Sequence, residues 1–225
     1  MRHLLRCWLM LATALAAATV FGEEPHISRE AIEWCNIWIP DANGTRLPRV
    51  LLIGDSITGG YGPTVAESLK GKASVARLTT SKSIGDPALL AEVALVLGQY
   101  RFDVVHFNNG LHGWGYSEAE YQKHFPELVA TIRKHAPKAR IIWATITPIR
   151  TPGNLGKVAE GTKRVKARNK IAEECVAKEA IPTNDLYGLV ANHPEYYSQD
   201  GVHFNSQGIA VQAEQVTARI LQSLK

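Results

Sequence analysis

The sequence predicts an α/β fold, a three-layer α/β/α sandwich around a mainly parallel sheet of five strands. First, from Arg49 onward, short apolar runs alternate with longer segments of helical periodicity. This alternation is typical of parallel strands joined by helical crossovers that cover both faces of a sheet. Second, the chain has 225 residues, of which 45% are hydrophobic and 20% are charged. Such a chain can form one domain with a substantial core.

Each expected element has its own local pattern. Apolar runs predict strands at residues 49–53, 74–78, 103–107, 140–144 and around 181–184. Helical periodicity predicts helices at residues 64–70, 87–100, 117–136, 159–179 and 206–224. Leu89, Val93 and Val96 share one helical face, and Ser117 followed by Glu120 resembles a capping box.

The order of these elements predicts where a ligand site lies. Right-handed crossovers place the carboxyl ends of parallel strands at one edge of the sheet, where ligands bind. Ser56 follows the first predicted strand, and residues 108–112 follow the third. The segment 200–203 precedes the last helix and can return to the same edge. We therefore expect these three segments to meet.

The first 22 residues have the composition of a secretory signal peptide. Arg2 and Arg6 precede an apolar stretch at residues 8–21, and Gly22 offers a small residue at the cleavage point. The stretch is too short for a comfortable membrane span. We therefore expect cleavage near Gly22 and export to the periplasm or the extracellular space, with no stable membrane span afterwards. An uncleaved N-terminal anchor is the alternative.

The charge and the cysteine content limit which partners the exported chain is expected to have. Without Arg2 and Arg6 there are 23 basic and 21 acidic residues, a net charge of +2. No basic cluster with interleaved aromatics is present, so no nucleic-acid partner is expected. Cys35 and Cys175 remain after cleavage, and they either pair in an oxidising compartment or stay as buried free thiols.

Residues 23–48 form an N-terminal arm ahead of the first predicted strand. The arm contains an aromatic and aliphatic cluster of Trp34, Ile37, Trp38 and Ile39. Such a cluster usually buries area against the body of a domain, and a stacking platform for sugars is the alternative.

Ser56 is the candidate nucleophile. Gly54, Gly59 and Gly60 surround it and permit a tight turn between the first strand and a helix. Backbone N–H groups at a helix N-terminus favour a developing negative charge. The segment is not a G-x-S-x-G elbow. A serine that only caps the helix and an anion-binding turn for a phosphate are the alternatives.

Asp200 and His203 are the candidates for the other two groups that a serine nucleophile needs. An imidazole takes the hydroxyl proton, and a carboxylate holds the ring. Alternatively, Asp200 belongs to a turn and His203 lies on the surface. A metal site would need His106 and His112 as well, and the sequence has no His-x-x-x-His pair and no cysteine cluster. We expect neither a metal nor another cofactor.

The paired motifs at opposite ends of the chain resemble those of the SGNH hydrolases, the GDSL esterase/lipase family. Gly54-Asp55-Ser56 is similar to the block that carries the nucleophile, and Asp200-x-x-His203 to the block that carries the other two triad members. The likeness covers residues 49–225. It implies a three-layer fold with flavodoxin-like strand order and catalytic roles for Ser56, Asp200 and His203.

Two departures concern the groups that hold the oxyanion. Where the family's third block carries an asparagine, this chain has His112, and the segment 108–112 resembles a branch with an Asn-x-Gly-Leu-His pattern. A ring N–H can also donate, so the resemblance implies His112 or Asn108 in this role. A histidine held at the edge of the core is the alternative. The family's oxyanion glycine falls at Ser81 in a short alignment and at Gly85 in a slipped one, and we favour the Ser81 N–H.

These residues predict a secreted serine hydrolase of short-chain carboxylic esters, with O-acetyl groups on a polysaccharide as one substrate class. An acetylated sugar would suit the aromatic residues near the expected site, Trp114, Tyr116 and Tyr61. The sequence shows no apolar lid segment of the kind that would favour a long-chain lipid. A lysophospholipase or thioesterase is the alternative of the same reaction class. A non-catalytic glycan-binding module and a phosphate-binding protein of flavodoxin type are the alternatives outside that class.

Overall fold

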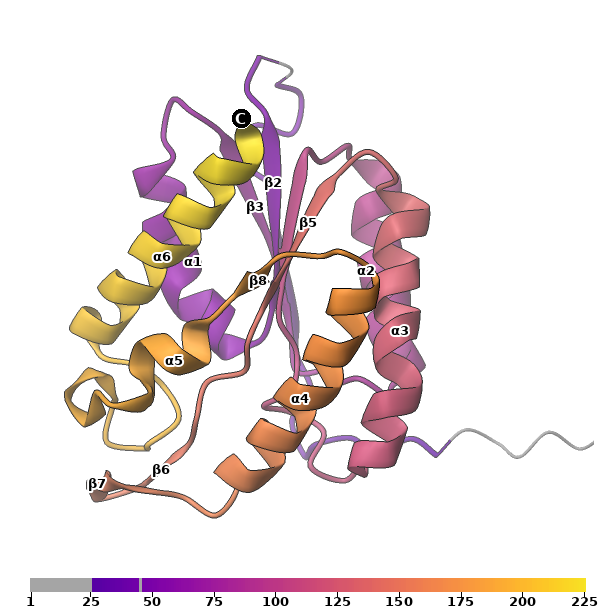
Figure 1. The fold of residues 1–225 in the computed structure, drawn as a ribbon. Helices are drawn as coiled ribbons and strands as arrows, with labels where there is room; N and C mark the ends of the chain where they lie inside the picture. The colour runs from indigo at the N-terminus through magenta and orange to yellow at the C-terminus, as the bar shows by residue number, and fades with distance from the viewer. Residues whose placement is uncertain (1–25, 45) are drawn as a thin grey trace, which may run out of the picture.

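The computed structural model describes residues 26–44 and 46–225, which form a three-layer α/β/α sandwich (Figure 1). The central sheet has six strands in the spatial order β1-β3-β2-β4-β5-β8. These strands are β1 (Cys35–Trp38), β2 (Arg49–Gly54), β3 (Ser74–Thr80), β4 (Val104–Phe107), β5 (Arg140–Ala144) and β8 (Thr183–Asn184). All neighbours except β1 and β3 run parallel. The five parallel strands have the flavodoxin-like order that the resemblance implies.

Strand β1 corrects the expectation of five strands. It comes from the N-terminal arm, pairs antiparallel with β3 and places Cys35 opposite Thr80. All four of its residues are exposed, with Ile37 at 41% and Trp38 at 61%, so the expectation that this apolar cluster is buried is wrong for these two residues. The arm is therefore part of the sheet rather than a segment ahead of it.

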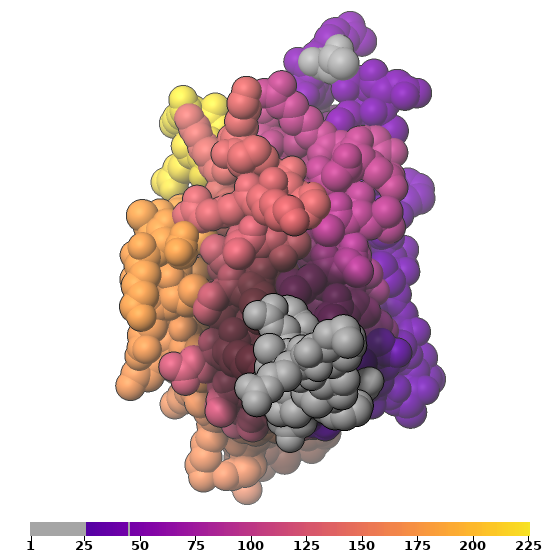
Figure 2. Space-filling view, turned by 90° about the vertical axis from the view of Figure 1, so that its right-hand side faces the viewer, coloured from indigo at the N-terminus to yellow at the C-terminus, as the bar shows by residue number. Residues whose placement is uncertain are grey.

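The helices cover both faces of the sheet, as expected. On one face α1 (Ser56–Ser68) packs against α6 (Ser206–Leu224). On the other, α2 (Pro87–Gln99), α3 (Glu118–His135) and α4 (Thr162–Lys178) pack side by side. Figure 2 looks onto this second face, with the indigo N-terminal residues along one edge.

Four short elements in the last third of the chain were not expected. They are α5 (Leu186–Ala191), a single 3₁₀ turn (Pro194–Tyr196) and a hairpin of β6 (Arg150–Thr151) and β7 (Asn154–Val158). Each is too short to show a hydrophobic period. The hairpin and the 3₁₀ turn nevertheless matter, because they flank the loop that contains Asp200 and His203.

Capping side chains determine where the helices begin. Helix α3 starts at the expected capping box, in which Ser117 and Glu120 satisfy each other's backbone N–H groups. Helix α1 starts at Ser56, eight residues earlier than expected, because the Asp55 side chain caps it. The glycines of this segment lower its helix propensity and hid its first turns from the sequence pattern. The extension places Ser56 in the first turn of a helix.

The core lies on both sides of the sheet. Residues 50–53 of β2 are each at most 1% exposed, so side chains that point to either face are buried, as in a strand covered by two layers of helices. Leu89 and Val93 of α2 are buried as well. Each such side chain contributes about 1.5–3 kcal/mol to folding.

The two cysteines of the described residues are free thiols, Cys35 on β1 and Cys175 on α4. Cys35 is exposed rather than buried. Across the described residues, no helix combines the length and the apolar content needed to cross a bilayer. The expected signal peptide, residues 1–22, lies outside the described residues.

Candidate active site

Ser56 lies at the junction of β2 and α1. Gly54 ends the strand, and a Cβ at this position would lie 2.1 Å from the Thr58 hydroxyl, so the turn requires glycine. Asp55 caps the helix, with its Oδ1 accepting the Ile57 N–H at 2.9 Å. Ser56 is thus the first residue of α1 and is half-buried. Its hydroxyl lies at a helix N-terminus, where unpaired N–H groups favour negative charge.

Asp200 and His203 lie in the loop before α6, and this loop returns to Ser56. The Nε2 of His203 is 2.8 Å from the Ser56 Oγ, although the two residues are 147 positions apart. The Nδ1 of the same ring is 2.7 Å from Oδ2 of Asp200. Between them, Gly201 adopts a φ of +73° and its carbonyl accepts the Arg150 N–H at 2.7 Å. The β6 strand therefore holds the loop in place.

The hydrogen bonds define what each ring nitrogen of His203 can do. An ionised carboxylate only accepts, so Nδ1 carries the proton that points at Asp200. In a neutral ring Nε2 is then an acceptor, and it faces the Ser56 hydroxyl. Burial alone would raise the pKa of Asp200, but hydrogen bonds from the His203 ring and from the N–H groups of Val202 and His203 outweigh it and lower this pKa. Asp200 is therefore ionised at neutral pH.

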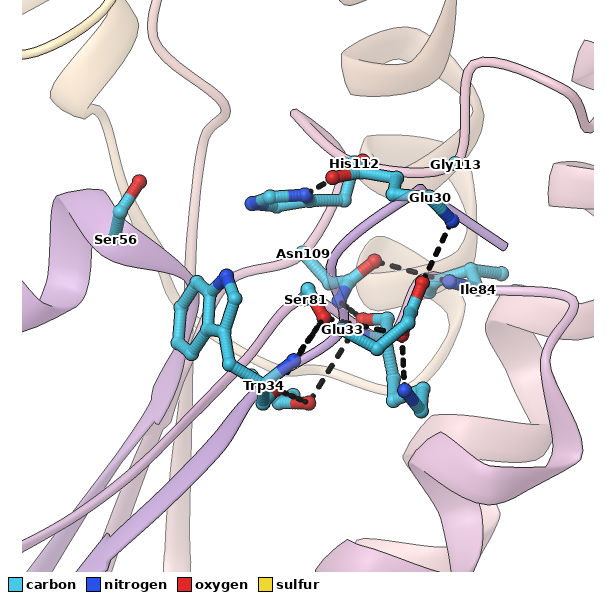
Figure 3. Close-up of polar contacts among 12 residues, drawn as sticks. Glu30, Glu33, Trp34, Ser56, Ser81, Ile84, Asn109, His112 and Gly113 are labelled. Carbon is cyan, nitrogen blue, oxygen red and sulfur yellow. Dashed lines mark hydrogen bonds and ion pairs between the residues drawn. The ribbon is translucent and has the colours of Figure 1, made fainter. Parts of the chain in front are cut away.

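A second histidine approaches from the loop after β4. The Nδ1 of His112 is 2.8 Å from Oε1 of Glu30. The ring meets Trp34 edge to face, with centroids 5.9 Å apart. Figure 3 shows the ring extending from Glu30 toward the side on which Ser56 lies.

Ser56, His112 and His203 line one cleft of about 410 Å³. The loop after β4 forms one wall, and the N-terminal arm forms another through Ser28, Arg29 and Glu30. Sequence reasoning missed the arm as part of the site. No motif or spacing indicates that Glu30 faces a histidine 82 positions later.

Ser81, favoured as the source of an oxyanion N–H, and Asn108, the alternative to His112, do not line the cleft, which disfavours both assignments. The Ser81 N–H donates to the Trp34 carbonyl at 3.0 Å, because the pairing between the arm and β3 continues through residue 81. The Asn108 amide donates to the Ala144 carbonyl at 2.7 Å and is buried. Of the expected oxyanion donors, His112 is the one whose side chain reaches the cleft.

The other residues selected from the sequence divide between the cleft and the interior. Trp114 lines the cleft, whereas Tyr61 and Tyr116 are buried. His106 is fully buried and lies 3.0 Å from the Asn184 amide, and burial lowers its pKa to about 4. Within residues 26–44 and 46–225, no group of three His, Cys, Asp or Glu side chains is arranged to hold a metal ion.

Arg168 of α4 holds the loop that carries His112. Its side chain is 1% exposed. Its terminal nitrogens donate at 2.9–3.2 Å to four backbone carbonyls, those of Gly110, His112, Gly113 and Tyr116. The Trp114 ring centroid lies 5.2 Å from the guanidinium carbon. The sequence carries no signal for this arginine, because the partners are backbone atoms more than 50 positions earlier.

Known proteins share both the sequence pattern and the fold. Residues 52–211 match the GDSL-like lipase/acylhydrolase family. A comparison with curated protein sequences gave no match. A lipase/acylhydrolase from Enterococcus faecalis has a TM-score of 0.60 at 21% identity, over 77% of this chain and 95% of that one.

Two solved carbohydrate-active esterases are similar as well. A carbohydrate esterase family 3 protein from Talaromyces cellulolyticus has a TM-score of 0.61 at 18% identity, over 78% of this chain and 97% of that one. An acetyl xylan esterase has a TM-score of 0.60 at 20% identity, over 76% and 99% of the two chains. At these identities the likeness establishes the fold.

Proposed function

The chain belongs to the GDSL-like lipase/acylhydrolase family and is an ester hydrolase, and we propose that it is a serine hydrolase whose triad is Ser56, His203 and Asp200. One observation carries this proposal. A continuous hydrogen-bonded line runs from the Ser56 Oγ through both ring nitrogens of His203 to Asp200, with distances of 2.8 and 2.7 Å. This is the geometry in which a base activates a hydroxyl and a carboxylate holds the base.

The reaction follows from that line of contacts. His203 Nε2 takes the Ser56 proton while Oγ attacks the ester carbonyl carbon. The oxygen of that carbonyl becomes negatively charged near the start of α1, where the Ser56 N–H and the ring of His112 stabilise it. The imidazolium of His203, stabilised by Asp200, then protonates the departing alcohol. Water attacks the acyl-enzyme by the same route and regenerates Ser56.

The walls of the cleft favour a small acyl group on a polar alcohol. Arg29, Glu30 and two histidines line it together with Trp114, which is 38% exposed. We therefore propose short-chain esters as substrates, with O-acetyl groups on carbohydrate as the natural class. The fold shared with an acetyl xylan esterase and a carbohydrate esterase supports this choice. We also propose that the protein is exported, on the basis of residues 1–22.

The Ser56→Ala variant tests the proposed function. It is expected to lose at least about 10³-fold in kcat on p-nitrophenyl acetate. Ser68→Ala is the matched control, because Ser68 lies exposed at the other end of α1 and only bonds the Thr64 carbonyl. A Ser56→Ala protein that remains folded and active would refute the triad. Binding of acetylated xylan without turnover by the wild type would instead favour a glycan-binding module.

The substrate class has a separate test. Across p-nitrophenyl acetate, butyrate and octanoate, kcat/KM is expected to be highest for acetate and to fall with chain length. Release of acetate from acetylated xylan is expected as well. A maximum at octanoate would contradict the short-chain assignment and favour a lysophospholipase.

A further inference from the structure

The cleft contains a second pair of imidazole and carboxylate, in addition to His203 and its partner Asp200. Glu30 Oε1 and His112 Nδ1 are 2.8 Å apart, and their side chains are 39% and 17% exposed. We propose that Glu30 is a positioning residue that fixes His112 with Nδ1 protonated, so that the oxyanion is stabilised by the imidazolium form of His112. This inference rests on the proposed function, because it assigns a positioning residue to the oxyanion donor of that same site.

The protonation state follows from the hydrogen-bond inventory. An ionised carboxylate has no proton to give, so Nδ1 of His112 must be the donor to Glu30. A neutral ring then has a bare Nε2, which would repel an oxyanion rather than bind it. Only a ring protonated on both nitrogens can donate to Glu30 and to the oxyanion together. The ring of His112 therefore donates as an imidazolium, in contrast to the neutral asparagine of the family pattern.

The contacts around His112 fix the direction of the ring. One nitrogen is held by Glu30, and one edge contact is made by Trp34. Arg168 holds the His112 carbonyl at 2.9 Å. Across the described residues, no protein group makes a hydrogen bond to Nε2 of His112, and Figure 3 shows this end of the ring on the Ser56 side. A partly buried ring that is oriented by these contacts, with one nitrogen unbonded at the cleft, is available to a ligand atom.

Glu30 itself is held in place through the arm. Its N–H donates to Oε1 of Glu33 at 2.7 Å. The other oxygen of Glu33 accepts from the Ser81 hydroxyl (Figure 3) and from the Lys82 ammonium. Ser28 adds a bond from its N–H to the Tyr116 hydroxyl at 2.8 Å. The carboxylate of Glu30 therefore projects from a segment that is tied to the end of β3 and to the loop beyond His112.

The charges that face His112 come from several elements. Glu30 contacts it from the arm, Asp55 at the start of α1 interacts with its charge, and His203 and Arg29 line the same cleft. Burial raises the pKa of Asp55, whereas the charges of His112 and His203 oppose that rise. Glu30 is the carboxylate that makes a direct contact with the His112 ring, at 2.8 Å.

The two histidines must then work in opposite charge states. His203 has to be neutral to accept the Ser56 proton, so activity falls at acid pH. His112 has to be charged to donate, so activity falls again as the pH rises and this ring loses its proton. A bell-shaped profile of kcat/KM with an alkaline limb from His112 is the signature of the proposal.

The first experiment uses Glu30→Gln, which keeps the shape of the side chain and removes its charge. It is expected to lower kcat on p-nitrophenyl acetate by about 10–100-fold, less than the loss of an oxyanion donor outright. KM is expected to stay within about threefold, because the contact matters in the transition state. The alkaline limb is expected to move to lower pH. Glu127→Gln is the matched control, because it removes a contact of the same length to His124 on α3, away from the cleft.

The second experiment asks whether Glu30 acts through His112. His112→Asn supplies a neutral amide donor that needs no carboxylate. This variant is expected to retain measurable but lower activity and to lose the alkaline limb of the pH profile. In the His112→Asn background, Glu30→Gln is expected to change kcat by less than about twofold, since residues that act as one unit are not additive. An equal loss in both backgrounds would show that Glu30 serves the fold rather than His112.

Nitrogen-15 NMR of the histidine rings keeps the test independent of turnover. The wild type is expected to show His112 protonated on Nδ1, and protonated on both nitrogens to a higher pH than in Glu30→Gln. Identical ring signals and identical pH profiles in the two proteins would overturn the inference. If no ester is hydrolysed by the wild type, the proposed function fails, whereas the ring signals still decide the role of Glu30.

Discussion

Replacing Arg168 by methionine should remove the main support of the loop that carries His112. The side chain is 1% exposed and donates to four backbone carbonyls of residues 110–116. Methionine fills most of the volume but leaves all four carbonyls without this donor. The loop then has to rearrange or to expose its backbone to water.

The magnitude follows from two opposing contributions. Four hydrogen bonds from a charged donor are worth about 1.5–3 kcal/mol each, or about 6–12 kcal/mol together. Against this stands the cost of a buried cation, several kcal/mol. This cost is visible in Arg168, because burial lowers its pKa. The net loss in Arg168→Met is therefore about 3–5 kcal/mol in the free energy of unfolding, which lowers Tm by about 6–20 °C in a domain of this size.

Urea unfolding followed by far-UV circular dichroism measures this loss. Arg164→Met is the paired variant, because Arg164 donates to the Trp114 and Tyr116 carbonyls of the same loop but is 30% exposed. Its loss is expected to be about 1 kcal/mol or less, since solvent screens exposed charges. An Arg168→Met protein destabilised by less than about 1 kcal/mol, or no more than Arg164→Met, would refute the reasoning.

Three further outcomes are expected. Asp200→Asn should lower kcat on p-nitrophenyl acetate by about 10²–10⁴-fold with little change in KM, because the carboxylate orients and stabilises the His203 ring; a loss below tenfold would contradict this role. Gly201→Ala should destabilise the protein by about 2–3 kcal/mol in urea unfolding and reduce kcat, because its Cβ would lie 2.2 Å from the Arg150 carbonyl oxygen at a φ of +73°. Hydrogen bonds from His26 and Ser117 lower the pKa of Glu120 from 4.5 to about 2. A carboxyl whose pKa is lower in the folded than in the unfolded state stabilises the fold at pH values above its unfolded-state pKa. This contribution is lost as the pH falls through the folded-state pKa. The free energy of unfolding of the wild type should therefore exceed that of Glu120→Gln by about 1 kcal/mol near neutral pH, and this difference should shrink as the pH falls toward 2; a pH-independent difference would be the contrary result.

The sequence predicted the parallel sheet well because each of its strands is a local pattern. The run 50–53 is apolar at every position because both faces of β2 are buried, and this can be recognised without knowing what covers it. The Ser117 capping box is equally local. By contrast, β1 has four exposed residues, and its pairing with β3 depends on the sheet edge that it meets. Nothing within the arm indicates that edge.

The residues of the candidate site also fall into two groups, those that local sequence motifs indicate and those that depend on distant partners. Ser56, Asp200 and His203 belong to short motifs, so sequence reasoning selected them together. Glu30 and Arg168 act through partners 82 and more than 50 positions away, and no spacing rule connects such pairs. Ser81 was selected by alignment to a family pattern, but a backbone N–H is available only if no neighbour uses it. Here the Trp34 carbonyl uses it, which could be known only from the pairing of the arm.

The most direct measurement is the site of covalent modification by a fluorophosphonate, located by peptide mass spectrometry. The predicted result is one adduct on Ser56 in the wild type, strongly reduced in His203→Ala, because the reagent reacts with a serine whose hydroxyl is activated by a base. An unmodified Ser56, or an adduct that forms equally fast without His203, would contradict the claim that this hydroxyl and this imidazole form one catalytic unit.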